Sequence, residues 1–111
     1  MFAVVQTRHI MAEFISIVTP AFNEARNISV LYKRLTVVLS GLDVPWEWVV
    51  VDDHSRDETW AVLQELAAGN SQLKAVRLAR NSGSHMALAC GLQKVSGTCA
   101  VVLAAALQDP P

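Results

Sequence analysis

The feature that most constrains this chain is a repeated alternation of short β-branched runs with segments of helical periodicity. Strand-like runs occupy residues 14–19, 46–51, 73–79 and 99–103. Between these runs, apolar residues recur every three or four positions, which is the pattern of an amphipathic helix. Four strands joined by three helices favour right-handed crossovers and a parallel sheet. The sequence therefore predicts an α/β fold, a Rossmann-like three-layer α/β/α arrangement with a mainly parallel sheet in the order β-α-β-α-β-α-β.

Each predicted helix has a recognisable boundary. The first spans about residues 24–40 and is followed by a glycine. The second follows a capping box, in which the Ser55 hydroxyl accepts an amide hydrogen bond and Glu58 reaches back to the backbone. It stops at Gly69. The third lies between a polar loop at residues 81–84 and the last strand.

Composition narrows the function classes. The chain has 52% hydrophobic and 17% charged residues, which argues against disorder and fits strands covered on both faces. Nine Lys and Arg against 10 Asp and Glu give a net charge of −1. This balance removes the electrostatic basis for binding nucleic acid or an anionic membrane. The two cysteines, Cys90 and Cys99, have no metal-ligand or disulfide spacing, so we expect reduced thiols in a cytoplasmic protein.

The 111 residues suffice for one domain. We expect residues 1–12 to be an N-terminal extension and residues 13–111 to be the domain. No apolar run approaches the roughly 20 residues that a membrane span needs, and the first dozen residues are too short and polar for a signal peptide. The chain is therefore expected to be soluble.

Polar loops follow the predicted strands, at residues 19–24, 52–55, 80–85 and 104–111. In an open α/β sheet, ligands bind beyond the carboxyl ends of the strands, so these loops predict a binding site. The chain has no GxxxxGK[ST] phosphate loop, and no GxGxxG follows the first strand, which disfavours the common nucleotide cradles. A receiver-like phosphorylation domain is also disfavoured, because the paired aspartates follow the second strand and no later strand-end Asp and Lys accompany them.

Four segments carry a family resemblance: Val18-Thr-Pro-Ala-Phe-Asn-Glu24, Val49-Val-Val-Asp-Asp-His-Ser-Arg-Asp-Glu-Thr59, Arg80-Asn-Ser-Gly-Ser-His85 and Leu107-Gln-Asp-Pro-Pro111. Together they resemble the inverting family-2 glycosyltransferases of the GT-A fold. In particular, the chain is similar to dolichyl- or polyprenyl-phosphate sugar transferases, whose corresponding last motif reads D-A-D-L-Q-D-P-P. The resemblance covers about residues 14–111.

The resemblance implies a pocket for a nucleotide-sugar donor of the UDP or GDP type. In it, Pro20, Phe22 and Glu24 would line the base and ribose site. Phe22 stands where relatives often carry Tyr, so ring stacking survives and a hydroxyl is lost.

The other implied contacts come from later strands. Asp53, with backbone help near Val51, would accept hydrogen bonds from the nucleobase, and Asp52 is its candidate partner. Arg80 and the helix start near His85 would face the phosphates or the sugar, where positive charge and N–H groups suit an anion.

Several of these residues have a plain structural alternative. Glu24 and Asp57 can simply favour a helix N-terminus, and Asn81 and Gly83 can simply build a turn. His85 can be a solvated polar residue. Three tryptophans could be sugar-stacking platforms but are expected in the core or covering the strands: Trp46, Trp48 and Trp60.

The last motif departs from the family. Where relatives carry Asp-x-Asp, this chain has Ala104, Ala105 and Ala106. In the family those carboxylates hold Mg²⁺ or Mn²⁺ against the donor diphosphate, since hard cations prefer oxygen ligands. Gln108 is left as the only remnant of the metal set, and Asp109 is expected to be structural. We therefore expect the metal to bind weakly or not at all.

The resemblance also implies that relatives carry their acceptor-binding half and general base beyond residue 111. We therefore expect an apparently truncated nucleotide-sugar-binding half that is inactive alone. In relatives the complete enzyme transfers a sugar to a polyprenyl-phosphate or saccharide acceptor at the cytoplasmic face of a membrane. The alternative is a non-catalytic nucleotide-binding or assembly module. For that module, an uncovered sheet edge and apolar patch make a homo-oligomer through the truncated face an expectation to test.

Overall fold

The structure is a computed structural model that describes residues 2–6 and 14–105. The elements in these ranges follow one another as β1 (Phe2–Gln6), β2 (Ile15–Ala21), α1 (Ala25–Ser40), β3 (Trp46–Asp52), α2 (Thr59–Gly69), β4 (Leu73–Arg77), α3 (Ser84–Gln93) and β5 (Cys99–Leu103). Among the described helices, none combines the length and the hydropathy needed to cross a membrane.

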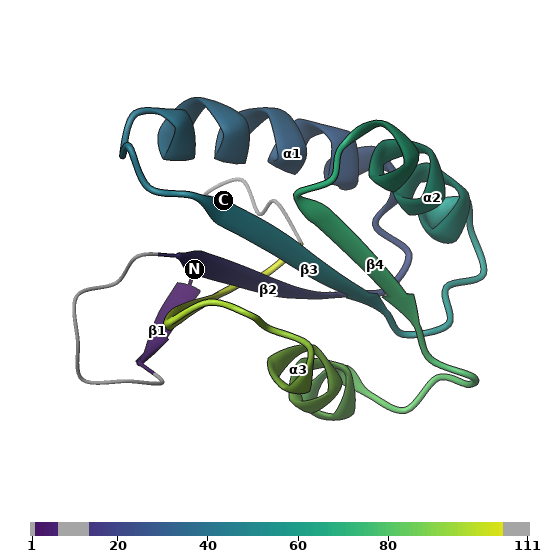
Figure 1. The fold of residues 1–111 in the computed structure, drawn as a ribbon. Coiled ribbons are helices and arrows are strands. Elements are labelled where there is room, and N and C mark those ends of the chain that lie inside the picture. Colours follow the sequence, from purple (N-terminus) through teal and green to yellow (C-terminus); the bar gives the residue numbers. More distant parts are fainter. Residues whose placement is uncertain (1, 7–13, 106–111) are drawn as a thin grey trace, which may run out of the picture.

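A five-stranded sheet in the order β1-β5-β2-β3-β4 forms the middle layer of the described part. Strands β5, β2, β3 and β4 run parallel, and β1 joins the edge antiparallel. Helices α1 and α2 cover one face of the sheet and α3 covers the other (Figure 1). The predicted three-layer α/β/α fold with a mainly parallel sheet is therefore confirmed.

Strand β1 is the element that the sequence does not predict. It lies within the segment expected to be an N-terminal extension, and its register pairs Phe2 with Leu103 and Gln6 with Cys99. The expectation of an uncovered edge at β5 is therefore wrong. Five residues without a local partner give no periodic signal, so this strand is defined by its distant pairing partner.

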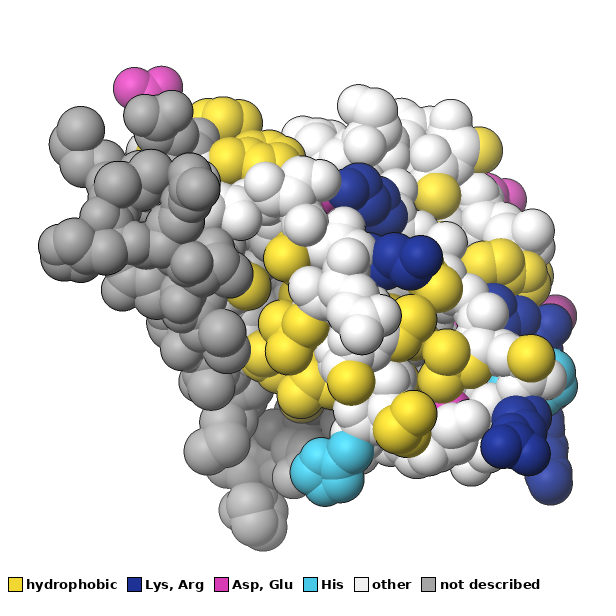
Figure 2. All heavy atoms as spheres, turned by 60° about the horizontal axis from the view of Figure 1, so that its bottom comes forward, with side chains coloured by type: hydrophobic (Ala, Val, Ile, Leu, Met, Phe, Trp, Pro, Cys, Tyr) yellow, Lys and Arg dark blue, Asp and Glu magenta, His cyan; other side chains and the backbone are white. Residues whose placement is uncertain are grey.

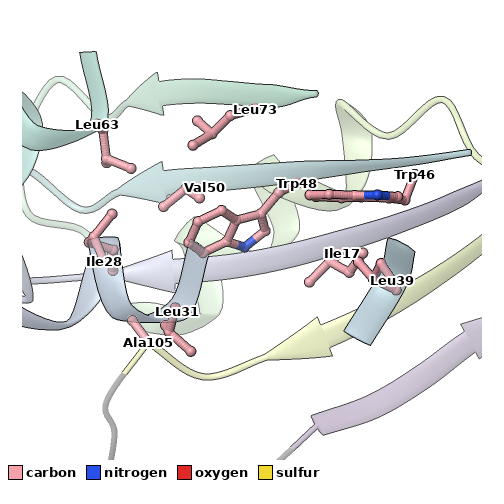
Figure 3. Packing of buried hydrophobic residues seen from close by; sticks show 11 residues of the cluster. Ile17, Ile28, Leu31, Leu39, Trp46, Trp48, Val50, Leu63, Leu73 and Ala105 are labelled. Carbon is pink, nitrogen blue, oxygen red and sulfur yellow. The ribbon is translucent and has the colours of Figure 1, made fainter. Parts of the chain in front are cut away.

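The larger part of the core lies between the sheet and the α1/α2 layer. Trp48 of β3 is fully buried at its centre, stacks on Tyr32 of α1 with ring centroids 6.3 Å apart, and donates from Nε1 to Thr19 Oγ1 (2.8 Å). Ile28, Leu31 and Leu63 close over it from the two helices (Figure 3). The tryptophans are core residues as expected: Trp46 and Trp48 are buried, and the half-buried Trp60 packs against the same cluster.

The fully buried residues on the opposite face have smaller side chains. Val18, Val49 and Val51 meet α3 at Ala87 and at Gly91. A Cβ on Gly91 would lie 2.5 Å from Val18 Cγ1, so this helix approaches the sheet as closely as a glycine allows. Figure 2 looks onto this side, where hydrophobic and cationic side chains are interspersed.

Element boundaries differ from the sequence prediction in two instructive places. Strand β2 continues through Pro20 to Ala21, two residues further than expected. The predicted capping box is wrong, because Glu58 is the N-cap residue of α2 and makes no side-chain capping hydrogen bond. The hydroxyl of Ser55 instead donates to the buried Asp52 and accepts from a backbone amide of another loop. Tertiary partners outcompete the local motif.

A buried polar network closes the amino end of the sheet. The Glu47 carboxylate of β3, 3% exposed, accepts from Ser16 Oγ (2.6 Å) and from Ser96 N (2.6 Å) through Oε2. Its Oε1 lies 2.7 Å from the Lys74 ammonium of β4. Ser16 Oγ in turn accepts from Gly97 N (2.8 Å). The network ties β2, β3 and β4 to the turn that leads into β5.

Candidate functional site

A cavity of about 450 Å³ opens at the carboxyl ends of β2, β3 and β5, where the sequence predicts a site. It combines an aromatic ring, two carboxylates, an amide side chain and the start of α3. The lining residues are Pro20, Ala21, Phe22, Glu24, Asp53, Asn81, Gly83, Ser84, Ala104 and Ala105.

The β2–α1 loop supplies the aromatic and acidic wall of the cavity. Phe22 is 41% exposed, which is unusual for a large apolar side chain and leaves its ring available to a ligand. Glu24 is the N-cap residue of α1 and makes no side-chain capping bond. Its Oε1 accepts a hydrogen bond from Asn27 Nδ2 (2.7 Å) instead. Because Asn27 lies in the first turn of α1, the Glu24 side chain contacts the helix start and also lines the cavity, and the two interpretations of Glu24 both stay open.

A set of cross-loop hydrogen bonds, here called the loop clasp, holds this wall in place. In it, residues 23–25 bond to residues 55–59. Asn23 N donates to Ser55 Oγ (2.8 Å), Glu24 N to Thr59 Oγ1 (2.9 Å) and Ala25 N to Asp57 Oδ2 (3.4 Å). In the other direction, the amides of Arg56 and Asp57 donate to Asn23 Oδ1.

The Asp57 carboxylate shows how the clasp is stabilised. Its Oδ1 also accepts from Thr59 N (2.9 Å), so Asp57 serves the start of α2 as well as α1. Burial by itself raises the pKa of Asp57, but hydrogen bonds from Thr59 and from backbone amides outweigh it, and the pKa lies below its ordinary value. The expected role of Asp57 at a helix N-terminus agrees with these contacts.

Asp53 forms the floor of the cavity and fixes the loop before α3. It is 4% exposed, and its oxygens accept from Ser82 N (2.7 Å), Gly83 N (2.9 Å) and Asn81 Nδ2 (3.3 Å). Gly83 has φ 96°, a backbone conformation that other side chains disfavour, which explains why a glycine occupies this position of the turn. A carboxylate can accept about four hydrogen bonds, and the described residues supply three.

The structure places two of the expected residues away from the cavity. Val51 is buried against α3. Asp52 is fully buried on the other side of β3, where Oδ1 accepts from the Ser55 amide (3.1 Å) and hydroxyl. Arg77 Nε lies 3.3 Å from Asp52 Oδ2 as an ion pair, although that oxygen has no hydrogen-bond donor among the described residues. Because adjacent strand residues face opposite sides, the two carboxylates point apart.

Arg80 and His85 do not line the cavity either, and both are exposed to solvent. The polar residues that do approach it from this side are Asn81, Gly83 and Ser84. Asn81 and Gly83 were open between a turn and a ligand role, and they build the turn while also lining the cavity. Ser84, which belongs with His85 to the helix start expected near the phosphates or the sugar, lines the cavity, whereas His85 does not.

The residues at the end of β5 do not fit a divalent cation. Ala104 and Ala105 line the cavity with methyl groups, which cannot ligate a metal. In the described ranges, no group of three His, Cys, Asp or Glu residues could hold one. Ala106, Gln108 and Asp109 lie outside the described residues.

Another cavity, also of about 450 Å³, lies between α1 and β5. Its walls are almost entirely apolar, with Arg34 as the charged residue among them. It lacks the convergent polar groups of a small-molecule site. Cys90 and Cys99 are free and half-buried.

Residues 16–111 match the protein family described as Glycosyl transferase family 2. The chain is 39% identical over 97 residues to an uncharacterised glycosyltransferase of Synechocystis, covering 87% of this chain and 30% of that protein. It is 41% identical over 98 residues to the undecaprenyl-phosphate 4-deoxy-4-formamido-L-arabinose transferase of Sodalis glossinidius, again covering 87% and 30%. The chain thus spans about 30% of the length of these curated relatives.

Solved structures agree with the sequence matches. The mannosyltransferase PcManGT of Pyrobaculum calidifontis, in complex with GDP-Man and Mn²⁺, superimposes with a TM-score of 0.71 at 25% identity, covering 85% of this chain and 27% of that one. The Staphylococcus aureus protein TarS (residues 1–349) in complex with UDP-GlcNAc gives 0.66 at 26% identity, covering 82% and 26%. The sequence match over nearly the whole chain and the shared fold lead to one conclusion: the chain belongs to glycosyl transferase family 2.

Proposed function

We propose that this chain is the nucleotide-binding part of a glycosyltransferase that moves a sugar from a nucleotide-sugar donor to a polyprenyl-phosphate or saccharide acceptor. The observation that carries the proposal is the cavity at the carboxyl edge of the sheet, with Phe22, Glu24 and Asp53 converging on it. Support comes from the relatives: several are named undecaprenyl-phosphate sugar transferases, and solved neighbours hold GDP-Man or UDP-GlcNAc.

In this proposal the described residues divide the work of holding a UDP- or GDP-type donor. The exposed Phe22 ring stacks on the nucleobase, and the remaining acceptor capacity of Asp53 takes a hydrogen bond from the base edge. Pro20 and Glu24 contact the base and the ribose. Arg80, in the exposed loop before α3, and His85, in the first turn of α3 beside Ser84, contact the phosphates or the sugar.

The alanines at the end of β5 predict donor binding without turnover. Relatives use Mg²⁺ or Mn²⁺ to neutralise the leaving diphosphate, which alanine cannot assist. We expect this 111-residue chain to bind a nucleoside diphosphate whether or not Mn²⁺ is present, and to transfer no sugar. We also expect the protein to act in the cytoplasm.

Calorimetric titration of the chain with UDP and GDP, with and without Mn²⁺, tests the proposal. The informative variant is Phe22→Ala, since an exposed ring can be removed without opening the core. Val37→Ala is the matched control, because Val37 is 77% exposed on the outer side of α1 and does not line the cavity. Phe22→Ala should weaken binding and Val37→Ala should not. A folded chain that binds neither nucleotide overturns the proposal, and clear sugar transfer overturns its inactive part.

One observation favours an assembly role as the second candidate. The apolar cavity between α1 and β5 continues into Val38 and Leu42, which are 62% and 50% exposed. Such a patch favours association. Light scattering over a range of concentrations measures the molar mass and tests this second candidate. A chain that stays monomeric at high concentration rules out the assembly role.

A further inference from the structure

Asn23 stands between two lining residues of the cavity without lining it itself. It adopts φ 54°, a left-handed conformation that Asn tolerates better than most other side chains. Its amide oxygen accepts from Arg56 N at 2.9 Å and from Asp57 N at 3.3 Å. One side chain thus supplies the acceptor for two amides of a loop that comes from another strand.

The partner loop is the fixed side of the loop clasp. Ser55 and Thr59 are 4% and 0% exposed, and the Ser55 hydroxyl is anchored on the fully buried Asp52. In contrast, Asn23 and Phe22 are exposed. On one side of Phe22, Ala21 is held by the sheet and accepts a hydrogen bond from Asp53 N (2.8 Å). On the other side, the loop clasp ties the chain to the buried core, so it limits how far the exposed ring can move.

We propose that Asn23 is a positioning residue for the nucleotide: its side-chain carbonyl holds the β2–α1 loop so that Phe22 and Glu24 face the cavity before the ligand arrives. The proposal rests on the nucleotide site proposed above. If folding already orders the loop, binding does not have to pay the entropy cost of ordering it, and the ligand binds more tightly. Asp52 and Ser55 do not line the cavity, but they affect the ligand indirectly, because the Ser55 hydroxyl bonds to Asp52 and accepts from Asn23 N.

The structure offers a clean variant. Asn23→Gly removes the acceptor but keeps the left-handed conformation accessible, and the two released amides are exposed and can bond to water. Asp43→Gly is the matched control: Asp43 has φ 55°, is exposed, and lies outside the cavity. Asn23→Asp keeps an acceptor oxygen and serves as the rescue variant. Asn23→Ser, which lacks the carbonyl, is run as a second variant in case the glycine variant does not fold.

Calorimetric titration with the nucleoside diphosphate that the unmodified chain binds gives the main readout. Asn23→Gly should weaken binding roughly tenfold, within the range that residues remote from a ligand can exert. Asp43→Gly should change it less than twofold, and Asn23→Asp should recover most of the loss. Amide exchange at Glu24 and Ala25, two of the donors of the loop clasp, should accelerate in Asn23→Gly but not in Asp43→Gly.

A double-mutant cycle with Phe22→Ala separates positioning from a general loss of stability. Because Asn23 is proposed to position Phe22 as well as Glu24, Asn23→Gly should weaken binding less in the Phe22→Ala background than in the unmodified chain. Binding by Asn23→Gly within twofold of the unmodified chain overturns the inference, and so does an equal loss in both backgrounds. If the unmodified chain binds no nucleotide, the proposed function fails first, which is a distinct result.

Discussion

The Glu47 network at the amino end of the sheet permits a quantitative prediction about stability. Glu47→Ala leaves the buried Ser16 hydroxyl and the partly buried Ser96 amide without their acceptor. It also removes the carboxylate that pairs with the Lys74 ammonium. Each buried donor left unpaired costs about 1–3 kcal/mol. Lys74 adds little to the loss, because its side chain is 43% exposed and its ammonium can be solvated by water once Glu47 is absent. We expect a loss of about 3–5 kcal/mol, a large part of the roughly 5–15 kcal/mol by which a domain is stable.

Graded variants test where this free energy comes from. Glu47→Gln keeps one oxygen for Ser16 and Ser96 but turns an amide toward the ammonium, so we expect a loss of about 1–2 kcal/mol. Lys74→Met should cost about 3 kcal/mol, because it leaves the Glu47 carboxylate, whose side chain is 4% exposed, buried without its counter-ion. Glu65→Ala, at an exposed position of α2, is the control and should stay within about 0.5 kcal/mol.

Urea denaturation followed by tryptophan fluorescence measures these losses, and pH supplies a second axis. Burial raises the pKa of Glu47, but hydrogen bonds from Lys74, Ser16 and Ser96 outweigh it, so its pKa lies below 4.5. The carboxylate therefore stabilises the folded state fully above pH 4.5, and this contribution is lost as the pH falls through the lowered folded-state pKa. The gap between the unmodified chain and Glu47→Gln should shrink there. A Glu47→Ala loss below about 1 kcal/mol would refute the reasoning.

Two further variants probe packing and chemistry. Gly91→Ala should destabilise the chain by about 1–3 kcal/mol in denaturant, because its Cβ meets Val18 Cγ1 at 2.5 Å; Gly69→Ala, which meets nothing within 4 Å, should be neutral or stabilising, and equal effects would contradict this view of α3. Joint replacement of Ala104 and Ala106 by Asp should make calorimetric binding of a nucleoside diphosphate depend on Mn²⁺, without raising the metal-free melting temperature, since two neighbouring carboxylates repel each other. A metal-free increase in melting temperature would contradict that account.

The fold could be predicted because its strands are covered on both faces. A strand such as β3, in which every residue is buried, reads as an apolar run whatever its neighbours are. β1 could not be predicted, because its partner β5 lies at the other end of the described chain. The local capping pattern at Ser55 was also misleading. The Ser55 hydroxyl does not cap α2; it donates to Asp52 and accepts from a backbone amide of a loop distant in sequence.

The part of the site that lies at the strand ends could be predicted from the sequence. Pro20, Phe22, Glu24 and Asp53 line the cavity because they follow, or end, strands that point the same way. Asp52 is next to Asp53 in the sequence but is still part of β3 and faces the other side of the sheet. Adjacent residues at the end of a strand face opposite sides of the sheet, so Asp53 lines the cavity while Asp52 is buried. Composition does not indicate which of the two aspartates faces the cavity.

The strand order has a consequence for how the chain acquires its structure during synthesis. β2, β3 and β4 are neighbours both in sequence and in the sheet, so this half can assemble as soon as residue 77 has left the ribosome. β5 must then insert at the open side of β2, and only afterwards does β1 have an edge to join. Until that moment β1 is an unpaired apolar segment exposed to other nascent chains. Although β1 precedes the other described strands in the sequence, its partner β5 is the last of them to be synthesised.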